Sequence, residues 1–311
     1  MAIKTVFVGS NWEALEVLKT LFNDENFHIE GIVTKPNKPV GRKQEIQNTP
    51  INDFAQKNSI PTIHPEKQEK LYQQALDLFK PELIVCTAFG EIIPGFFLEY
   101  PKYKAINIHF SLLPKYRGAI PIQKAILNGD KETGVTFLIM VEKLDAGPMI
   151  AQFKEPIREY DTNETLRQRL INKTKDVLIP VLNNWVAGKI KPVPQDESQA
   201  TYCYQKEISK EKAQIDWANM DPQYIERMIR AFVPWPVAWT YINDVRIKIY
   251  QAQLIDAKAS GIELKPGEAR GINKRLFIGT KDPHLFMQIL ELQPEGGKRM
   301  TGETYLNGRD I

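Results

Sequence analysis

Cysteine is nearly absent from this chain, and long apolar runs are missing. The 311 residues include two cysteines, Cys86 and Cys203, which lie far apart and show no CxxC or Cys/His metal spacing. We therefore expect no disulfide framework and no metal, and a reducing compartment is the default. No apolar run is long enough to span a bilayer, and the opening MAIKTVFVGS is too short and strand-like for a signal peptide. These absences predict a cytoplasmic protein.

A strong charge of one sign is also lacking. The sequence has 41 Lys and Arg against 38 Asp and Glu, and its net charge of +3 permits a polyanionic partner without requiring one. The stretch VGSN, after the first apolar run, lacks the GxGxxG pattern, so a dinucleotide site is not expected. At roughly 100–200 residues per domain, the length suggests two domains.

Short apolar runs alternate with helical periodicity over the first part of the chain. Strands are predicted at 5–10, 29–34, 82–88 and 105–110, with helices at 11–22, from about 51, and at 67–79. The intervening residues 35–50 are rich in proline and cations and are expected to form a loop. Alternating strands and helices predict a mostly parallel α/β sheet.

The pattern changes along the second part of the chain. Residues 134–140 and 147–157 are typical of an edge hairpin or two late strands, and 162–188 of a long amphipathic helix. Further on, alternating strands with a turn at Asn243-Asp244 predict a small β-barrel. We therefore divide the chain into an α/β domain at 1–188, a polar, proline-rich linker at 189–206 and a β-barrel domain at 207–311.

The strand INIHF carries two polar side chains on one face. Asn107 and His109 alternate with Ile106, Ile108 and Phe110, so the amide and the imidazole point the same way. The carboxyl ends of parallel strands are where open α/β sheets bind ligands. A satisfied pair of core polar groups is the competing interpretation, because buried polar groups need partners.

The residues after this strand favour a site. Ser111–Pro114 forms a short loop, and a helix is expected to begin at Pro121 and to end at Gly129. The polar face of the strand therefore meets a loop and a helix N-terminus. Further on, Asp145 stands before a glycine in LDAG, between two apolar runs, where shaping a turn is the plainer explanation.

Taken together, these motifs resemble the folate-dependent formyltransferases. That family carries Asn-x-His, Ser-Leu-Leu-Pro, Arg-Gly-x-x-Pro and Leu-Asp-x-Gly, and all four occur here between Asn107 and Gly147. VTKPNKPVGR, KEISKEKAQIDW and IRAFVPWPVAW resemble the branch that formylates methionyl-initiator tRNA. The resemblance covers nearly the whole chain. It implies a Rossmann-like catalytic domain and an OB-like β-barrel that binds tRNA.

The resemblance also implies the chemistry. A formyl group would pass from 10-formyltetrahydrofolate to an amine through a tetrahedral intermediate. Asn107 and His109 would donate hydrogen bonds to its oxyanion, and Asp145 would take the proton of the amine and orient His109. The folate is expected to contact Ser111, Leu112, Leu113, Pro114, Phe89, Gly90 and Ile92.

The cationic loop is expected to meet the tRNA. By resemblance, Lys35, Lys38, Arg42 and Lys43 would contact phosphates near the acceptor end. We expect a monomer. One alternative is a sugar-nucleotide N-formyltransferase, which would share the Asn, His and Asp; another is a catalytically silent RNA-binding protein. The identity of the amine that accepts the formyl group separates these alternatives.

Overall fold

The computed structural model describes residues 1–40, 45–257, 263–307 and 309. The chain forms two compact units. Unit 1 consists of Met1–Ala119, Thr133–Glu155 and Gln168–Tyr202. Unit 2 consists of Ile120–Glu132, Pro156–Arg167 and Cys203–Ile311. Two stretches that precede Cys203, Ile120–Glu132 and Pro156–Arg167, therefore belong to the second unit.

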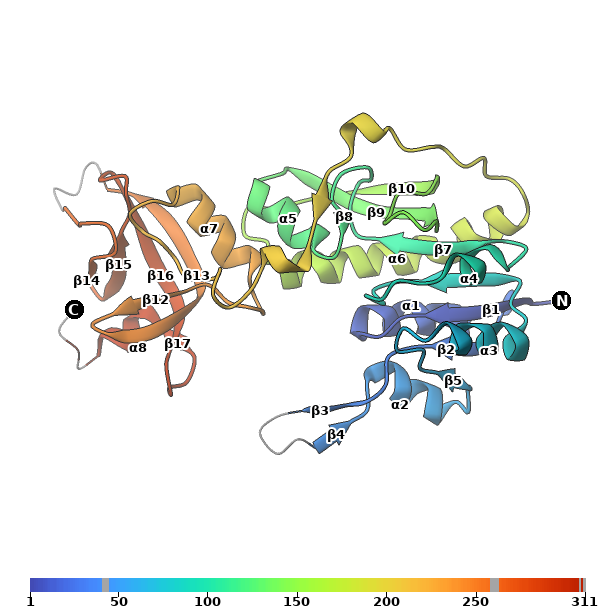
Figure 1. The fold of residues 1–311 in the computed structure, drawn as a ribbon. Helices are drawn as coiled ribbons and strands as arrows, with labels where there is room; N and C mark the ends of the chain where they lie inside the picture. Colours follow the sequence, from blue (N-terminus) through green and yellow to red (C-terminus); the bar gives the residue numbers. More distant parts are fainter. Residues whose placement is uncertain (41–44, 258–262, 308, 310–311) are drawn as a thin grey trace. The chain divides into compact units, whose positions relative to one another are not determined.

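Unit 1 is built on a seven-stranded sheet with the order β10-β9-β7-β6-β1-β2-β5 (Figure 1). Its strands are β1 (Ile3–Val8), β2 (Phe27–Val33), β5 (Thr62–Ile63), β6 (Leu83–Cys86), β7 (Ala105–His109), β9 (Glu132–Ile139) and β10 (Met149–Pro156). The pairs formed by β1, β2, β5, β6 and β7 are parallel, and β9 runs antiparallel to β7. The predicted mostly parallel sheet is confirmed, and the two late strands lie at one edge.

Two helices of this unit begin at side chains that cap them. Its helices are α1 (Trp12–Phe22), α2 (Pro50–Lys57), α3 (Glu69–Phe79), α4 (Gly95–Glu99) and most of α6 (Asn163–Val186). The Asn11 side chain accepts the Ala14 N–H, and the Thr49 hydroxyl accepts that of Asn52. All four residues of β6 are buried, which is typical of a parallel sheet covered on both faces.

The segment expected as a loop contains two short strands. β3 (Lys38–Val40) and β4 (Glu45–Gln47) pair antiparallel, with Lys38 opposite Gln47. The loop prediction was wrong for these residues. Val40 and Ile46 are β-branched, and proline is tolerated in an edge strand such as β3.

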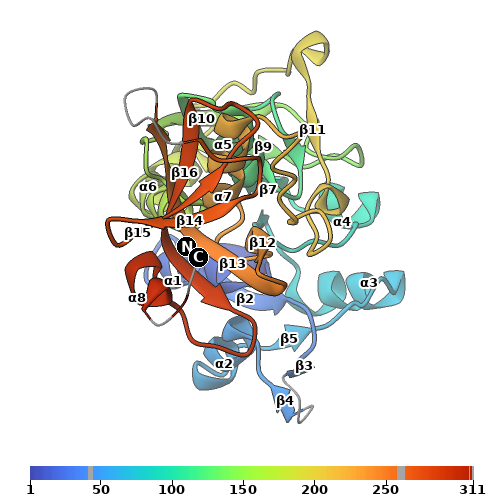
Figure 2. The same ribbon diagram turned by 90° about the vertical axis from the view of Figure 1, so that its left-hand side faces the viewer.

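Unit 2 contains a curled antiparallel half-barrel with the strand order β12-β13-β16-β15-β14 (Figure 2). The strands are β12 (Trp239–Ile242), β13 (Val245–Asp256), β14 (Ala269–Ile272), β15 (Arg275–Gly279), β16 (Leu285–Pro294) and β17 (Met300–Thr301), which pairs with β16. The helices are α5 (Pro121–Asn128), α7 (Pro222–Ala231) and α8 (Gly302–Leu306). The predicted turn is confirmed, because Asn243 and Asp244 join β12 to β13 with φ of 47° and 60°.

The predicted linker has structure of its own. It contains the 3₁₀ turn η1 (Glu197–Gln199) and reaches β11 (Tyr202–Cys203) and η2 (Gln205–Glu207). The backbone N–H of Arg117, which begins β8 (Arg117–Gly118), donates to Thr201 O at 2.9 Å. The Thr201 hydroxyl accepts the N–H of Tyr116 at 2.9 Å. Part of this segment is therefore fixed against the residues that follow β7.

None of the helices in the described ranges has the length and apolarity needed to span a bilayer.

Candidate active site

The three predicted catalytic residues lie together at the carboxyl end of β7. Asn107 Nδ2 donates to Asp145 Oδ1 at 3.1 Å. His109 Nδ1 lies 3.6 Å from Asp145 Oδ2, within ion-pair distance but too far for a hydrogen bond. Both His109 and Asp145 are largely removed from solvent, with side chains 7% and 11% exposed. The two polar residues on one face of β7 thus converge on a single carboxylate.

The hydrogen bond from the other ring nitrogen defines the protonation of His109. Nε2 lies 2.9 Å from Tyr116 O, and a carbonyl oxygen can only accept, so Nε2 carries a proton. In the neutral ring, Nδ1 would then turn a lone pair toward Asp145. In the imidazolium it would turn an N–H toward Asp145 and complete an ion pair. In either form, therefore, Nδ1 faces the Asp145 carboxylate.

Asp145 is held on both carboxylate oxygens and at its backbone. Besides the amide of Asn107, the backbone N–H of Gly118 donates to Oδ2 at 2.8 Å. The residue has a φ of 47°, in the left-handed region that few residues other than glycine adopt. Asp tolerates this conformation better than most residues. Shaping a turn and presenting a carboxylate are therefore both functions of Asp145.

The glycine of the Leu-Asp-x-Gly motif has a steric reason. A Cβ added at Gly147 would lie 1.7 Å from Ile139 O, an impossible distance to a backbone atom at the end of β9. The backbone of Ile139 is also held in place, because its N–H donates to Pro148 O at 2.9 Å. The close approach of these two backbones places Asp145 beside β7.

A buried arginine organises a second layer of the site. The Arg117 side chain is 0% exposed. It donates to Gln195 Oε1, to both carboxylate oxygens of Glu197 and to Tyr202 Oη. Hydrogen bonds from Arg117 first, then from Lys143, lower the pKa of the Glu197 carboxyl to about 2.

Sequence reasoning missed this second layer. Arg117 stands in the Arg-Gly motif, which was the available signal, but its partners fall in a polar, proline-rich segment that predicts only a linker. Gln195 also donates to the backbone carbonyls of Asp145 and Gly147, at 2.7 and 2.8 Å. The segment after α6 therefore takes part in the site.

The Ser-Leu-Leu-Pro loop is fixed by side chains of neighbouring strands. The Ser111 hydroxyl donates to Lys115 O at 2.6 Å, and the Thr136 hydroxyl donates to Ser111 O at 2.6 Å. Leu113 is buried, whereas Leu112 and Pro114 are half-buried. Leu112 packs over Gly134, where an added Cβ would come within 2.4 Å of Leu112 Cδ2.

The other predicted folate residues follow β6. Phe89 is buried, Gly90 has a φ of 69°, and Ile92 is 90% exposed. Lys35, predicted to bind tRNA, lies among them: its Nζ donates to Gly90 O at 3.4 Å and lies 6.0 Å from the centroid of the Phe89 ring. The structure thus brings Lys35 to the predicted folate residues.

Of the remaining predicted tRNA contacts, only one lies among the described residues. Lys38 lies in β3, so its backbone is described, and Arg42 and Lys43 lie outside the described residues. Within the described ranges, no group of three or more His, Cys, Asp or Glu side chains could hold a metal ion. Burial raises the pKa of the Cys86 thiol, and the charge of Asp145 raises it further, so this thiol is inert.

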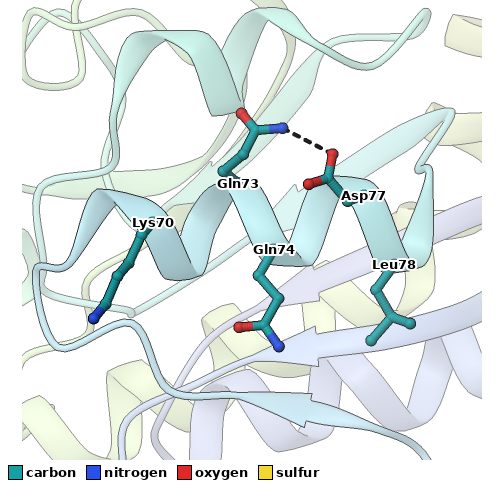
Figure 3. A pocket seen from close by; sticks show the side chains of 5 residues that line it. All are labelled: Lys70, Gln73, Gln74, Asp77 and Leu78. Carbon is teal, nitrogen blue, oxygen red and sulfur yellow. Dashed lines mark hydrogen bonds between the residues drawn. The ribbon is translucent and has the colours of Figure 1, made fainter.

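A depression on the surface of α3 is unrelated to this site. It is lined by Lys70, Gln73, Gln74, Asp77 and Leu78, which all project from the outer face of one helix (Figure 3). The Gln73 amide donates to Asp77 at 2.9 Å, and both side chains are exposed. Asn107, His109 and Asp145 do not line this depression.

Family comparisons agree with the two-part organisation of the chain. Residues 3–182 match the family model described as formyl transferase, and residues 207–310 match the formyl transferase C-terminal domain. The chain belongs to the formyl transferase family.

Relatives that match nearly the whole chain carry the name of one branch of this family. The Methionyl-tRNA formyltransferase of Bacillus velezensis is 39% identical over 310 residues, covering 99% of this chain and 95% of the relative. That of a Geobacillus species is 40% identical over 308 residues, covering 98% and 94%. The solved N-formyltransferase from Helicobacter canadensis, in complex with folinic acid and dTDP-3-aminofucose, has a TM-score of 0.68 at 21% identity, covering 92% of this chain and 99% of that one. At that identity the likeness concerns the fold alone.

Proposed function

We propose that this protein transfers the formyl group of 10-formyltetrahydrofolate to the amino group of methionyl-initiator tRNA, giving formylmethionyl-tRNA for translation initiation. The observation that carries the proposal is the convergence of Asn107 and His109 on the Asp145 carboxylate at the carboxyl edge of the sheet. Relatives named methionyl-tRNA formyltransferase, 39–40% identical over nearly the full length of both chains, supply the acceptor.

The residues around Gly90 and Leu112 suit a folate. The exposed side chain of Ile92 and the half-buried one of Leu112 offer apolar surface to a flat ring. Gly90 has no side chain, and its carbonyl and N–H are of the kind that bind the polar edge of a pterin. The co-substrate supplies the formyl carbon that an amine attacks. We assign Ser111, Pro114 and Phe89 to the walls of this pocket.

The chain's own groups handle charge and protons. Asn107 gives one amide N–H to Asp145, and the second N–H of that amide has no acceptor among the described residues. It is therefore available to a developing oxyanion, and one such donor is typically worth about 3 kcal/mol of barrier. The Asp145 carboxylate takes the proton of the attacking amine and returns it to the folate nitrogen. That nitrogen leaves as its bond to the formyl carbon breaks, which gives tetrahydrofolate. His109, which already donates from Nε2, gains an ion-pair partner in Asp145 when Nδ1 is protonated.

In this proposal, the N-terminal and C-terminal parts of the chain have different functions. Residues 1–188 hold the folate and the chemistry, 189–206 connect, and 207–311 bind tRNA. Lys38, Arg42 and Lys43 contact phosphates near the acceptor end of the tRNA. Lys35, expected to act with them, lies instead beside Phe89 and Gly90 of the folate pocket. The charged acceptor places the reaction in the cytoplasm. The protein acts as a monomer without a metal.

One formylation assay tests the acceptor. Labelled 10-formyltetrahydrofolate is offered with methionyl-initiator tRNA, with charged elongator tRNA and with an amino-sugar nucleotide, and Asp145→Asn is the inactive control. Label should pass to initiator methionyl-tRNA alone. Label on the amino sugar would establish the alternative, a sugar-nucleotide N-formyltransferase, and label on none of the three would refute a formyl transfer of either kind.

A further inference from the structure

Gln195 spans the turn that carries Asp145. Its side-chain nitrogen donates to Asp145 O at 2.7 Å and to Gly147 O at 2.8 Å. An amide nitrogen has two N–H groups, so both are used on this one turn. The residue lies 50 positions beyond Asp145, in the segment after α6, and it is half-buried.

Arg117 fixes the direction of this amide. Its Nε and Nη2 both donate to Gln195 Oε1, at 3.1 and 2.9 Å. Because a guanidinium has no acceptor, the oxygen of Gln195 must face Arg117 and the nitrogen must face the turn. All four hydrogen-bonding positions of the amide are therefore in use. Glu197 and Tyr202 hold the other side of the guanidinium.

The turn needs such support. Asp145 has a φ of 47°, which is unfavourable for a residue with a side chain, and persists where surrounding contacts determine it. Its side chain is supported by Asn107 and Gly118, which are themselves close to the reacting position. Gln195 supports the backbone of the turn instead, through the carbonyls of Asp145 and Gly147.

We propose that Gln195 is a positioning residue for the carboxylate of Asp145. It fixes the Asp145–Gly147 turn by two hydrogen bonds, and Arg117 fixes Gln195. A residue of the connecting segment thus sets the geometry of the carboxylate, without touching the substrates. The kinetic part of this inference rests on the proposed function; the geometric part does not.

Gln195→Met tests the inference in the full chain. Methionine keeps the length of the side chain but can neither donate to the turn nor accept from Arg117 in the same way. Because an error of about 1 Å at a reacting centre can cost roughly 10²-fold in rate, we expect kcat to fall about 10- to 100-fold. KM for formylfolate and for tRNA should stay within about threefold, since the substrates are not contacted. Gln199→Met is the matched control, because Gln199 is exposed and its amide donates to Asp196.

Hydrogen exchange at Gly118 provides a readout that does not depend on activity. Its N–H donates to Asp145 Oδ2, so displacement of the carboxylate should speed exchange at this amide at least tenfold in Gln195→Met. The N–H of Thr87, which donates to Val8 O inside the sheet, reports the general stability of the fold. It should exchange at the wild-type rate in both variants.

Three results would overturn the inference. The first is an unchanged Gly118 exchange rate, and the second is a normal kcat despite faster exchange. The third is equal acceleration at Gly118 and Thr87, which would mean that Gln195 only stabilises the fold. If the wild-type chain formylates no methionyl-tRNA, the proposed function fails, and the exchange rates still decide the position of Asp145.

Discussion

Asn107 and Asp145, which are 38 positions apart, share a hydrogen bond of 3.1 Å. The amide lies on β7, and the carboxylate lies in the turn after β9, the antiparallel neighbour of β7. A second N–H, from Gly118, is given to the other carboxylate oxygen. Each oxygen of Asp145 therefore has one fixed N–H donor and keeps lone-pair capacity for a proton from the substrate.

Replacing Asn107 by alanine should lower kcat by about 10²–10³. The change removes a donor to the oxyanion and leaves Asp145 Oδ1 without its protein partner, and one oxyanion donor is worth about that factor. The measurement is formylation of methionyl-tRNA at saturating substrates, with the thermal midpoint as a check of folding. Asn26→Ala, in an exposed turn, is the control. A folded Asn107→Ala protein with near-normal kcat would remove Asn107 from the catalytic group.

Gly147→Ala should damage both stability and turnover. The new Cβ would lie 1.7 Å from Ile139 O, so one of the two backbones must move. Overpacking of this kind typically costs about 1–3 kcal/mol. The movement shifts the Asp145 turn, so kcat should fall by about 10² as well. Chemical unfolding and steady-state kinetics measure the two effects.

Gly188→Ala separates the two effects of that change. An added Cβ at Gly188 meets no atom within 4 Å, but its φ of 69° is strained for alanine. It should lose about 1–2 kcal/mol of stability and keep normal kcat. If Gly147→Ala behaved in the same way, with full activity per folded molecule, the turn would not need its close approach to β9.

The sequence predicts those parts of the fold that depend on local signals. The buried parallel strands and the Asn243-Asp244 turn are confirmed because each leaves a pattern within a few residues. The grouping of Asn107 with Asp145 was predicted from family motifs, since periodicity says nothing across 38 positions.

The missed features are tertiary. Arg117 and Gln195 are 78 positions apart, and a polar segment held by side-chain hydrogen bonds shows no periodicity that would distinguish it from a linker. The β3–β4 ribbon was missed because proline and cations dominate residues 35–50, although Val40 and Ile46 have the side chains of strand residues.

Acid should weaken the contact between Glu197 and Arg117. The pKa of Glu197 is lowered from its usual 4.5 to about 2, chiefly by Arg117 and then by Lys143. A depressed folded-state pKa gives stability that is complete above the unfolded value and is lost as pH falls through the folded value. The destabilisation caused by Glu197→Gln should therefore be largest above pH 4.5 and should vanish near pH 2.

Thermal unfolding midpoints between pH 6 and about pH 2 measure this difference. Glu69→Gln, an exposed carboxylate in the first turn of α3, controls for the general effect of removing an acidic group. If Glu197→Gln lowered the thermal midpoint by the same amount at every pH, the charge of the Glu197 carboxylate would not stabilise the buried arginine.

The cations around residues 35–43 should fall into two kinetic classes. Arg42→Ala and Lys43→Ala should raise KM for tRNA, and each lost phosphate contact should reduce the salt slope of tRNA binding by roughly 0.7–0.9. Formylation of a small free amine should be unchanged in both.

Lys35→Met should instead raise KM for formylfolate and impair the formylation of both acceptors, because Lys35 Nζ lies against Gly90 O and Phe89. If Lys35→Met lowered only the affinity for tRNA and the salt dependence of tRNA binding, Lys35 would be a tRNA contact and not part of the folate pocket. Equal losses for both acceptors in Arg42→Ala would mean that Arg42 supports the folate pocket and does not clamp tRNA.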